Sequence, residues 1–240
     1  MVAGAVAQGG FFSAPRSDTA FGAALPLANW MWLAEPPSWD RALVLAEVDS
    51  PLNHVMPLRY DEVVAVAPSQ CMSTGQFKLP LPSEAVSSVA LESEGLGHLL
   101  RSPVPRLEAA RFAKAVLEEC RRVLRPGGVL LVGERNPNWP THGQDAIHFA
   151  PFVVARMLTG KHGRAICDAA AAAGFREVRR YYATPSHELP RSIVPATRAA
   201  ALLYERFAGS PVTRDTLRYA LAWAGLHWVL HPSVMVVAHR

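Results

Sequence analysis

Cysteine is scarce in this sequence. Its 240 residues include three cysteines, Cys71, Cys120 and Cys167, which lie far apart. A disulfide framework needs cysteines in pairs, and a zinc site needs ligands at close, regular spacing. Neither pattern is present, so the sequence predicts a reducing compartment, taken as the cytoplasm, and no metal site.

Long apolar runs and two common catalytic motifs are also absent. No apolar run approaches the roughly 18–20 residues that a membrane span needs, and the first ten residues lack the basic start of a signal peptide. The Gly-x-Ser-x-Gly turn of hydrolases and the Gly-x-x-x-x-Gly-Lys loop of nucleotide-binding proteins do not occur. A membrane span, a serine hydrolase elbow and a P-loop are therefore not predicted.

Charge is modest overall but unevenly distributed. Half of the residues are apolar, 18% are charged, and the net charge is +4. Residues 1–150 hold 12 basic and 15 acidic residues, whereas residues 151–240 hold 12 and 5. An anionic partner should therefore bind to residues 151–240, the C-terminal third of the chain. Few aromatic residues lie among its arginines, so nucleic acid is not favoured as that partner.

Four short apolar runs predict strands. Residues 42–46, 62–67, 86–91 and 129–132 are almost continuously apolar, which is typical of parallel strands buried on both faces. Residues 106–124 have the spacing of an amphipathic helix, and Pro126-Gly127-Gly128 should turn the chain from it into the next strand. A strand, a helix and a strand in this order predict a right-handed crossover unit.

The alternation of helices and strands continues to the C-terminus. Helices are expected at residues 165–174, 197–208 and 213–226, and strands at 177–183 and 234–238. This order predicts one doubly wound α/β domain over residues 40–240, with a helical insertion at about 185–230. Residues 1–39 are expected to form an N-terminal extension with a short helix at 27–33.

Four segments carry a family resemblance. Residues 119–132, ECRRVLRPGGVLLV, resemble the helix-to-strand turn of the class I S-adenosylmethionine-dependent methyltransferases. Residues 77–82 (FKLPLP), 173–178 (AGFREV) and 232–238 (PSVMVVA) are similar to other segments of that family, in the same order. The resemblance covers about residues 40–240. It implies a mostly parallel, Rossmann-like sheet of seven strands closed by an antiparallel last strand, and S-adenosylmethionine as cofactor.

The sequence departs from the family at both cofactor signatures. Where the family has a glycine-rich turn, residues 44–52 contain no glycine, and Pro51 removes a donor. Ala67 stands where the family has an acidic residue after its second strand. Three explanations are open. The protein is an inactive relative, or it is an enzyme that holds the cofactor through Glu47, Asp49 or backbone near Leu81. In the third, its alignment with the family is shifted by a residue or two. The resemblance assigns seven residues to the cofactor: Ala46, Glu47, Asp49, Ala67, Pro68, Leu81 and Glu92.

The most polar loop after a predicted strand is expected to bind the acceptor. Its candidate residues are Glu134, Arg135, Asn136, Asn138 and Trp139, because charged, amide and aromatic groups can orient a small molecule. The alternative is a solvated loop with an Asn-Pro turn. His98 and His142 are the candidate bases, although nine histidines offer other choices.

The leading interpretation of function is methyl transfer to a small acceptor, either anionic or lipid-like. The second interpretation is an inactive methyltransferase-like protein that binds a ligand or a partner protein. Apolar residues in the helical insertion would form core, an acceptor pocket, or a surface for a protein partner or a homodimer.

Overall fold

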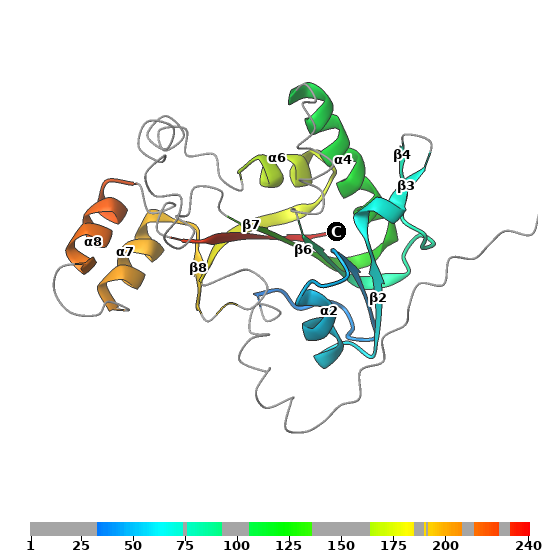
Figure 1. Cartoon of the computed structure of the whole chain (residues 1–240), viewed down its shortest axis with the longest axis horizontal. Coiled ribbons are helices and arrows are strands. Elements are labelled where there is room, and N and C mark those ends of the chain that lie inside the picture. Colours follow the sequence, from blue (N-terminus) through cyan, green and yellow to red (C-terminus); the bar gives the residue numbers. More distant parts are fainter. Residues whose placement is uncertain are drawn as a thin grey trace, which may run out of the picture.

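Seven strands form one mixed sheet in the order β2-β1-β5-β6-β9-β7-β8 (Figure 1). The computed structural model describes residues 33–73, 76–92, 106–135, 164–184, 190, 192–207, 214–225 and 231–240. The strands of the sheet are β1 (Arg41–Leu45), β2 (Glu62–Val66), β5 (Val86–Glu92), β6 (Leu124–Arg135), β7 (Arg176–Thr184), β8 (Ser192–Pro195) and β9 (Ser233–His239). A separate hairpin pairs β3 (Met72–Ser73) with β4 (Gln76–Phe77).

The direction of the strands confirms the predicted architecture. Strands β2, β1, β5 and β6 pair in parallel, and β9 runs antiparallel to its neighbours β6 and β7. After β1 the chain adds β2 on one side and later β5 on the other. Such a switch point, here at the carboxyl ends of β1 and β5, is where open α/β sheets bind ligands.

Helices cover both faces of the sheet (Figure 1). Helices α4 (Arg106–Val123) and α6 (Arg164–Ala172) lie on one face, and α2 (Leu52–Val55) with the 3-10 turn η2 (Met56–Leu58) lies on the other. Leu43 and Leu45 of β1 belong to the core under α4, whereas Ala42 and Val44 belong to the core under α2. The prediction of strands buried on both faces is therefore confirmed for β1 and β5. It is wrong for β2, which is half-buried except at Val66 because it lies at the edge of the sheet.

The turn after α4 has the expected chemistry. Gly127 has a φ of +74°, a conformation that side-chain-bearing residues rarely adopt. A Cβ on Gly128 would lie 2.8 Å from the carbonyl oxygen of Arg125. The pairing of β6 with β5 begins at Leu124 and resumes at Val129, so the predicted turn forms an irregularity inside β6.

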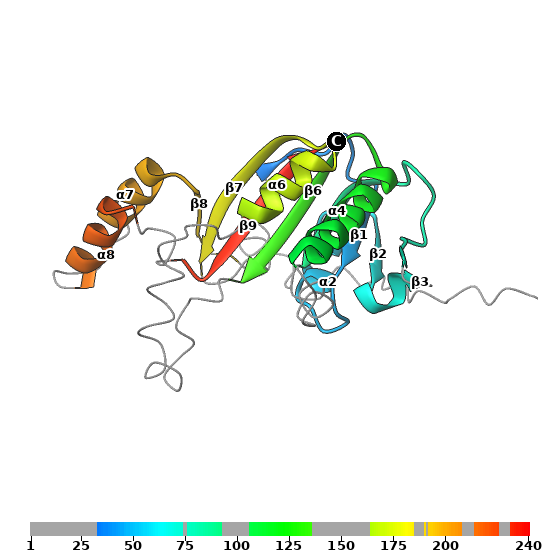
Figure 2. The ribbon, with the colours of Figure 1, turned by 90° about the horizontal axis from the view of Figure 1, so that it is seen from above.

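The helical insertion contains α7 (Arg198–Phe207) and α8 (Arg214–Trp223), which lie beside each other at the β8 end of the sheet (Figures 1 and 2). Thr197 Oγ1 accepts a bond from the N–H of Ala200 and so caps α7. Both helices were expected, but β8 was not. None of the described helices is long and apolar enough to cross a membrane. The helix expected at residues 27–33 lies, apart from Leu33, outside the described residues.

Candidate functional site

A buried hydrogen bond joins the carboxyl ends of the neighbouring strands β1 and β5. Ser50, in the loop after β1, donates from Oγ to Oε1 of Glu92, the last residue of β5, at 2.7 Å. Both side chains are buried, and Ser50 Oγ also accepts from the N–H of Leu52 at 3.2 Å. Glu92 was a predicted site residue, but Ser50 was missed. The Ser50-Pro51 pair marks a turn in the sequence, although nothing local indicates that it reaches β5.

The loop after β1 is closed on itself. The side-chain amide of Asn53 donates from Nδ2 to the carbonyl oxygens of Glu47 and Val48, at 2.9 and 3.1 Å. The N–H of Ser50 donates to Glu47 O at 3.0 Å, and the N–H of Ala46 donates to Val66 O at 3.3 Å. The N–H groups of Ala46 and Ser50 and the carbonyl oxygens of Glu47 and Val48 are therefore used within the protein.

Two carboxylates of this loop face solvent. Glu47 and Asp49 are both exposed, and the side chain between them, Val48, is 76% exposed. Ala46 is buried beneath them. The carboxyl end of β1 thus presents two negative charges next to the bonded pair of Ser50 and Glu92.

The end of β2 carries no acid. Ala67 is half-buried directly after β2, and Pro68 is buried at the start of the 3-10 turn η3 (Pro68–Cys71). The nearest acidic residues, Asp61 and Glu62, lie at the opposite end of this strand. A shift of one or two residues in the alignment therefore cannot restore the family's carboxylate at β2.

Leu81 lies away from the other predicted cofactor residues. Its carbonyl oxygen accepts a bond from Arg122 in the last turn of α4, at 2.9 Å, before β5 begins. Glu92 ends β5, and a seven-residue strand spans about 20 Å. The structure thus places Leu81 near the amino end of the strand and the other candidates near its carboxyl end. It does not bring them together.

The acceptor side is described only at its start. Glu134 is half-buried near the end of β6. The pKa of the Cys167 thiol is raised chiefly by burial; the charge of Arg180 lowers it, and the charges of Asp168 and Glu134 raise it. Arg135 ends β6, and its side chain lies outside the described part. The remaining candidates of this group fall outside the described residues: His98, Asn136, Asn138, Trp139 and His142.

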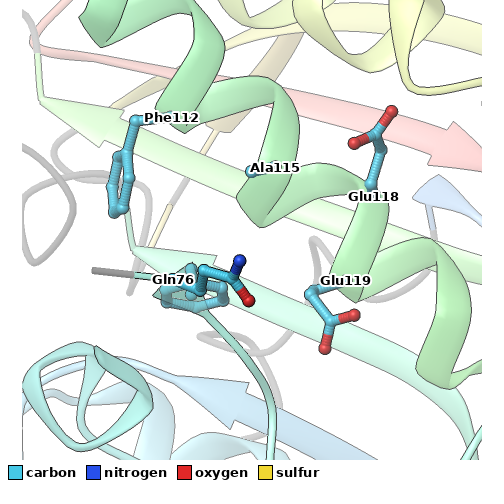
Figure 3. Close-up of a pocket in the computed structure, with 6 residues that line it drawn as sticks. Gln76, Phe112, Ala115, Glu118 and Glu119 are labelled. Carbon is cyan, nitrogen blue, oxygen red and sulfur yellow. The ribbon is translucent and has the colours of Figure 1, made fainter. Parts of the chain in front are cut away.

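A cavity of about 500 Å³ opens between β4 and α4 (Figure 3). Phe112 points from α4 toward β4 and meets Phe77 edge-to-face, with ring centroids 6.0 Å apart. The lining residues come from β4 and α4: Gln76, Phe77, Phe112, Ala115, Glu118 and Glu119. No motif marks this cavity, because its two walls come from distant segments of the chain.

The buried thiols are poor nucleophiles. Burial raises the pKa of Cys71 to about 11, and the pKa of Cys120 is raised further because its thiol is completely enclosed. Thiolates are the reactive form, so neither side chain suits covalent chemistry. Within the described part of the chain, no group of three or more His, Cys, Asp or Glu side chains could hold a metal ion.

No model of a known protein family matches the sequence, and no curated protein matches it. Similar solved structures include a SAM-dependent methyltransferase from Archaeoglobus fulgidus, with a TM-score of 0.46 and 10% identity over 93% of this chain and 94% of that one. Another, from Thermotoga maritima, has a TM-score of 0.41 and 13% identity over 92% and 95%. An N-methyltransferase from Haemonchus contortus, solved with S-adenosylhomocysteine, has a TM-score of 0.40 and 12% identity over 95% and 59%.

The sheet has the closing strand that the resemblance implies, since β9 lies antiparallel between β6 and β7. By its strand order and directions, the chain has a Rossmann-like α/β fold. Within this fold, the crevice does not fit S-adenosylmethionine in the family's glycine-rich mode, because the loop after β1 has no glycine, its Ser50 N–H is bonded to Glu47 O, and Ala67 follows β2. The exposed carboxylates of Glu47 and Asp49 offer a different set of groups, which suits hydroxyl donors and positive charge.

Proposed function

We propose that this protein is an S-adenosylmethionine-dependent methyltransferase that holds its cofactor through carboxylates instead of a glycine-rich turn. The observation that carries the proposal is the exposure of Glu47 and Asp49 at the carboxyl end of β1. They lie at the switch point of the sheet, beside Glu92, which Ser50 fixes. Ribose hydroxyls are donors to carboxylates, and the cofactor's sulfonium is a cation that negative charge attracts.

The chemistry needs little covalent help from the protein. The cofactor supplies an activated methyl group, so the protein contributes binding, alignment and exclusion of water. The Ser50–Glu92 bond would hold the loop after β1 against β5 and so keep the two exposed carboxylates in place. In this proposal the loop after β6 would orient a small acceptor, through Arg135, Asn136, Asn138 and Trp139, next to Glu134. His98 or His142 would take a proton from an acceptor that must lose one.

The second candidate is an inactive methyltransferase-like protein that binds a ligand or a partner protein. The closed loop favours it specifically, because the Ser50 N–H is bonded to Glu47 O and Asn53 holds the carbonyl oxygens of Glu47 and Val48. Both candidates use the same fold. They differ in whether the cofactor binds at the carboxyl end of β1.

Calorimetry on the full chain with S-adenosylmethionine and S-adenosylhomocysteine tests the proposal. We expect a dissociation constant above about 100 μM for S-adenosylmethionine, a binding free energy of roughly 5.5 kcal/mol or less. Because S-adenosylhomocysteine lacks the sulfonium charge, it should bind more weakly still. Glu47→Gln and Asp49→Asn should each weaken S-adenosylmethionine about two- to fivefold, the scale of an exposed charge pair, with a smaller effect on S-adenosylhomocysteine.

The matched control is Glu177→Gln, which removes an exposed carboxylate of β7 and should change neither affinity. Absence of binding by both compounds at millimolar concentration would favour the inactive candidate. Tight binding that is unchanged in Glu47→Gln and Asp49→Asn would place the cofactor elsewhere. It would refute the proposal that these carboxylates hold it.

A further inference from the structure

Helices α7 and α8 form an antiparallel pair held by charge. Glu205 of α7 is buried and accepts two hydrogen bonds from the Arg218 guanidinium of α8, at 2.6 and 2.7 Å. At the other end of the pair, the guanidinium of Arg198 lies over the ring of Trp223, 5.7 Å from its centroid. These contacts fix which face of each helix is turned outward.

The pair is anchored to the end of the sheet through Tyr204. Its hydroxyl hydrogen-bonds with Ser192 Oγ of β8 at 3.0 Å, and its ring lies against His231, with centroids 5.8 Å apart. His231 is buried and stacks on Tyr182 of β7. The helical pair is therefore presented from one end of the sheet, as Figure 2 shows.

The outward surface of this pair is apolar and basic. Leu203, Tyr219 and Trp223 are 57%, 43% and 63% exposed, and Arg198 and Arg206 are exposed on α7. We call these five residues the outer face. Among the described side chains of the two helices, the one carboxylate is that of Glu205, and it is buried. The side chain of Asp215 is not among the described residues.

We propose that the outer face docks onto the surface of an anionic lipid bilayer. Tryptophan and tyrosine prefer the interface between water and lipid, and arginine keeps its charge among the headgroups while its stem covers apolar surface. The charge is complementary, since Arg198 and Arg206 are exposed on the outer face and the described carboxylate of the pair, Glu205, is buried. Helices of ten residues such as these would lie in the plane of the interface rather than span the bilayer.

A second copy of the chain fits this surface less well. A two-fold dimer through the outer face would bring the same surface from both copies together. The arginines of one copy would then face those of the other, and like charges in apposition oppose association. The apolar area and the charge therefore point to the same anionic partner.

Vesicle sedimentation with the full chain tests this proposal. We expect the protein to sediment with vesicles of phosphatidylcholine mixed with phosphatidylglycerol, and much less with phosphatidylcholine alone, and binding should fall as salt screens the charges. Arg198→Gln should lower the partition coefficient about fivefold, the effect of one cation near an anionic surface. Trp223→Ser should lower it about tenfold, because it removes apolar area from the interface.

The control is Arg111→Gln, which removes an exposed cation from α4 and should leave binding unchanged. The proposal is overturned if the protein binds both kinds of vesicle equally. It is also overturned if Arg198→Gln and Trp223→Ser bind vesicles as strongly as the wild type does. So would a concentration-dependent dimer that Trp223→Ser abolishes, because it would assign the outer face to a second copy. Melting curves of the variants show that each one is folded.

Discussion

Arg122 is expected to hold the segment before β5 to the end of α4. Its side chain makes five hydrogen bonds. Nε and Nη2 donate to the Glu119 carboxylate, each at 2.9 Å. Nη1 and Nη2 donate to the carbonyl oxygens of Leu81 and Leu79, at 2.9 and 3.2 Å, and Nη1 reaches Ser83 Oγ at 3.5 Å. The N–H of Leu79 completes the network by donating to Glu119 at 3.0 Å.

Arg122→Ala removes every one of these donors. A net contribution of about 1.5–3 kcal/mol is usual for a buried hydrogen bond to a charged group, and exposed ion pairs contribute about 0–1 kcal/mol. The side chains of Arg122 and Glu119 are 30% and 20% exposed, so water can replace part of the network. We therefore expect a loss of about 2–3 kcal/mol of unfolding free energy, which lowers Tm by about 4–12 °C at this chain length.

Chemical and thermal denaturation measure this loss, with Arg111→Ala as the matched control on an exposed position of the same helix. Arg122→Lys should recover less than half of it, because an ammonium cannot reproduce the fork of the guanidinium. A double-mutant cycle with Glu119→Gln should give a coupling of about 1 kcal/mol or more. The reasoning fails if Arg122→Ala costs no more than the control.

The remaining predictions concern a turn, a loop and a titration. Gly127→Val should destabilise the protein by at least about 1–2 kcal/mol because residue 127 has a positive φ, and Gly127→Asn should cost clearly less. Gly128→Val should destabilise it because the new side chain would clash with the backbone. Urea denaturation compares the stabilities of the three variants. Arg135→Ala should weaken ligand binding or activity by about 1.5–3 kcal/mol with Tm unchanged, and an unchanged ligand response would remove this loop from the site. The pKa of Glu119 is lowered chiefly by its hydrogen bond with Arg122. Its stabilising effect is therefore present above its ordinary pKa of about 4.3 and is lost as pH falls through the pKa of the folded state. The difference in unfolding free energy between the wild type and Glu119→Gln should disappear in acid, and a difference independent of pH would contradict this assignment.

Much of the fold is predictable because its signals are local. Strand β1 is apolar after Arg41, and β5 is apolar except for Ser87, Ser88 and Glu92, since both faces of these strands are buried. The turn at Gly127 depends on the φ of a single residue. Strand β8 was missed because its four residues, ending in Pro195, form a strand only by pairing with β7.

In the candidate site, too, local features were predictable and contacts between distant segments were not. The lack of glycine in the loop after β1 and the alanine at position 67 can be read from the amino-acid sequence, because these are properties of single positions. The hydrogen bond from Ser50 to Glu92 and the position of Leu81 near the opposite end of β5 could not be predicted from it. Such contacts join segments far apart in the chain, and the order and direction of the strands, rather than any local preference, bring their side chains together or keep them apart.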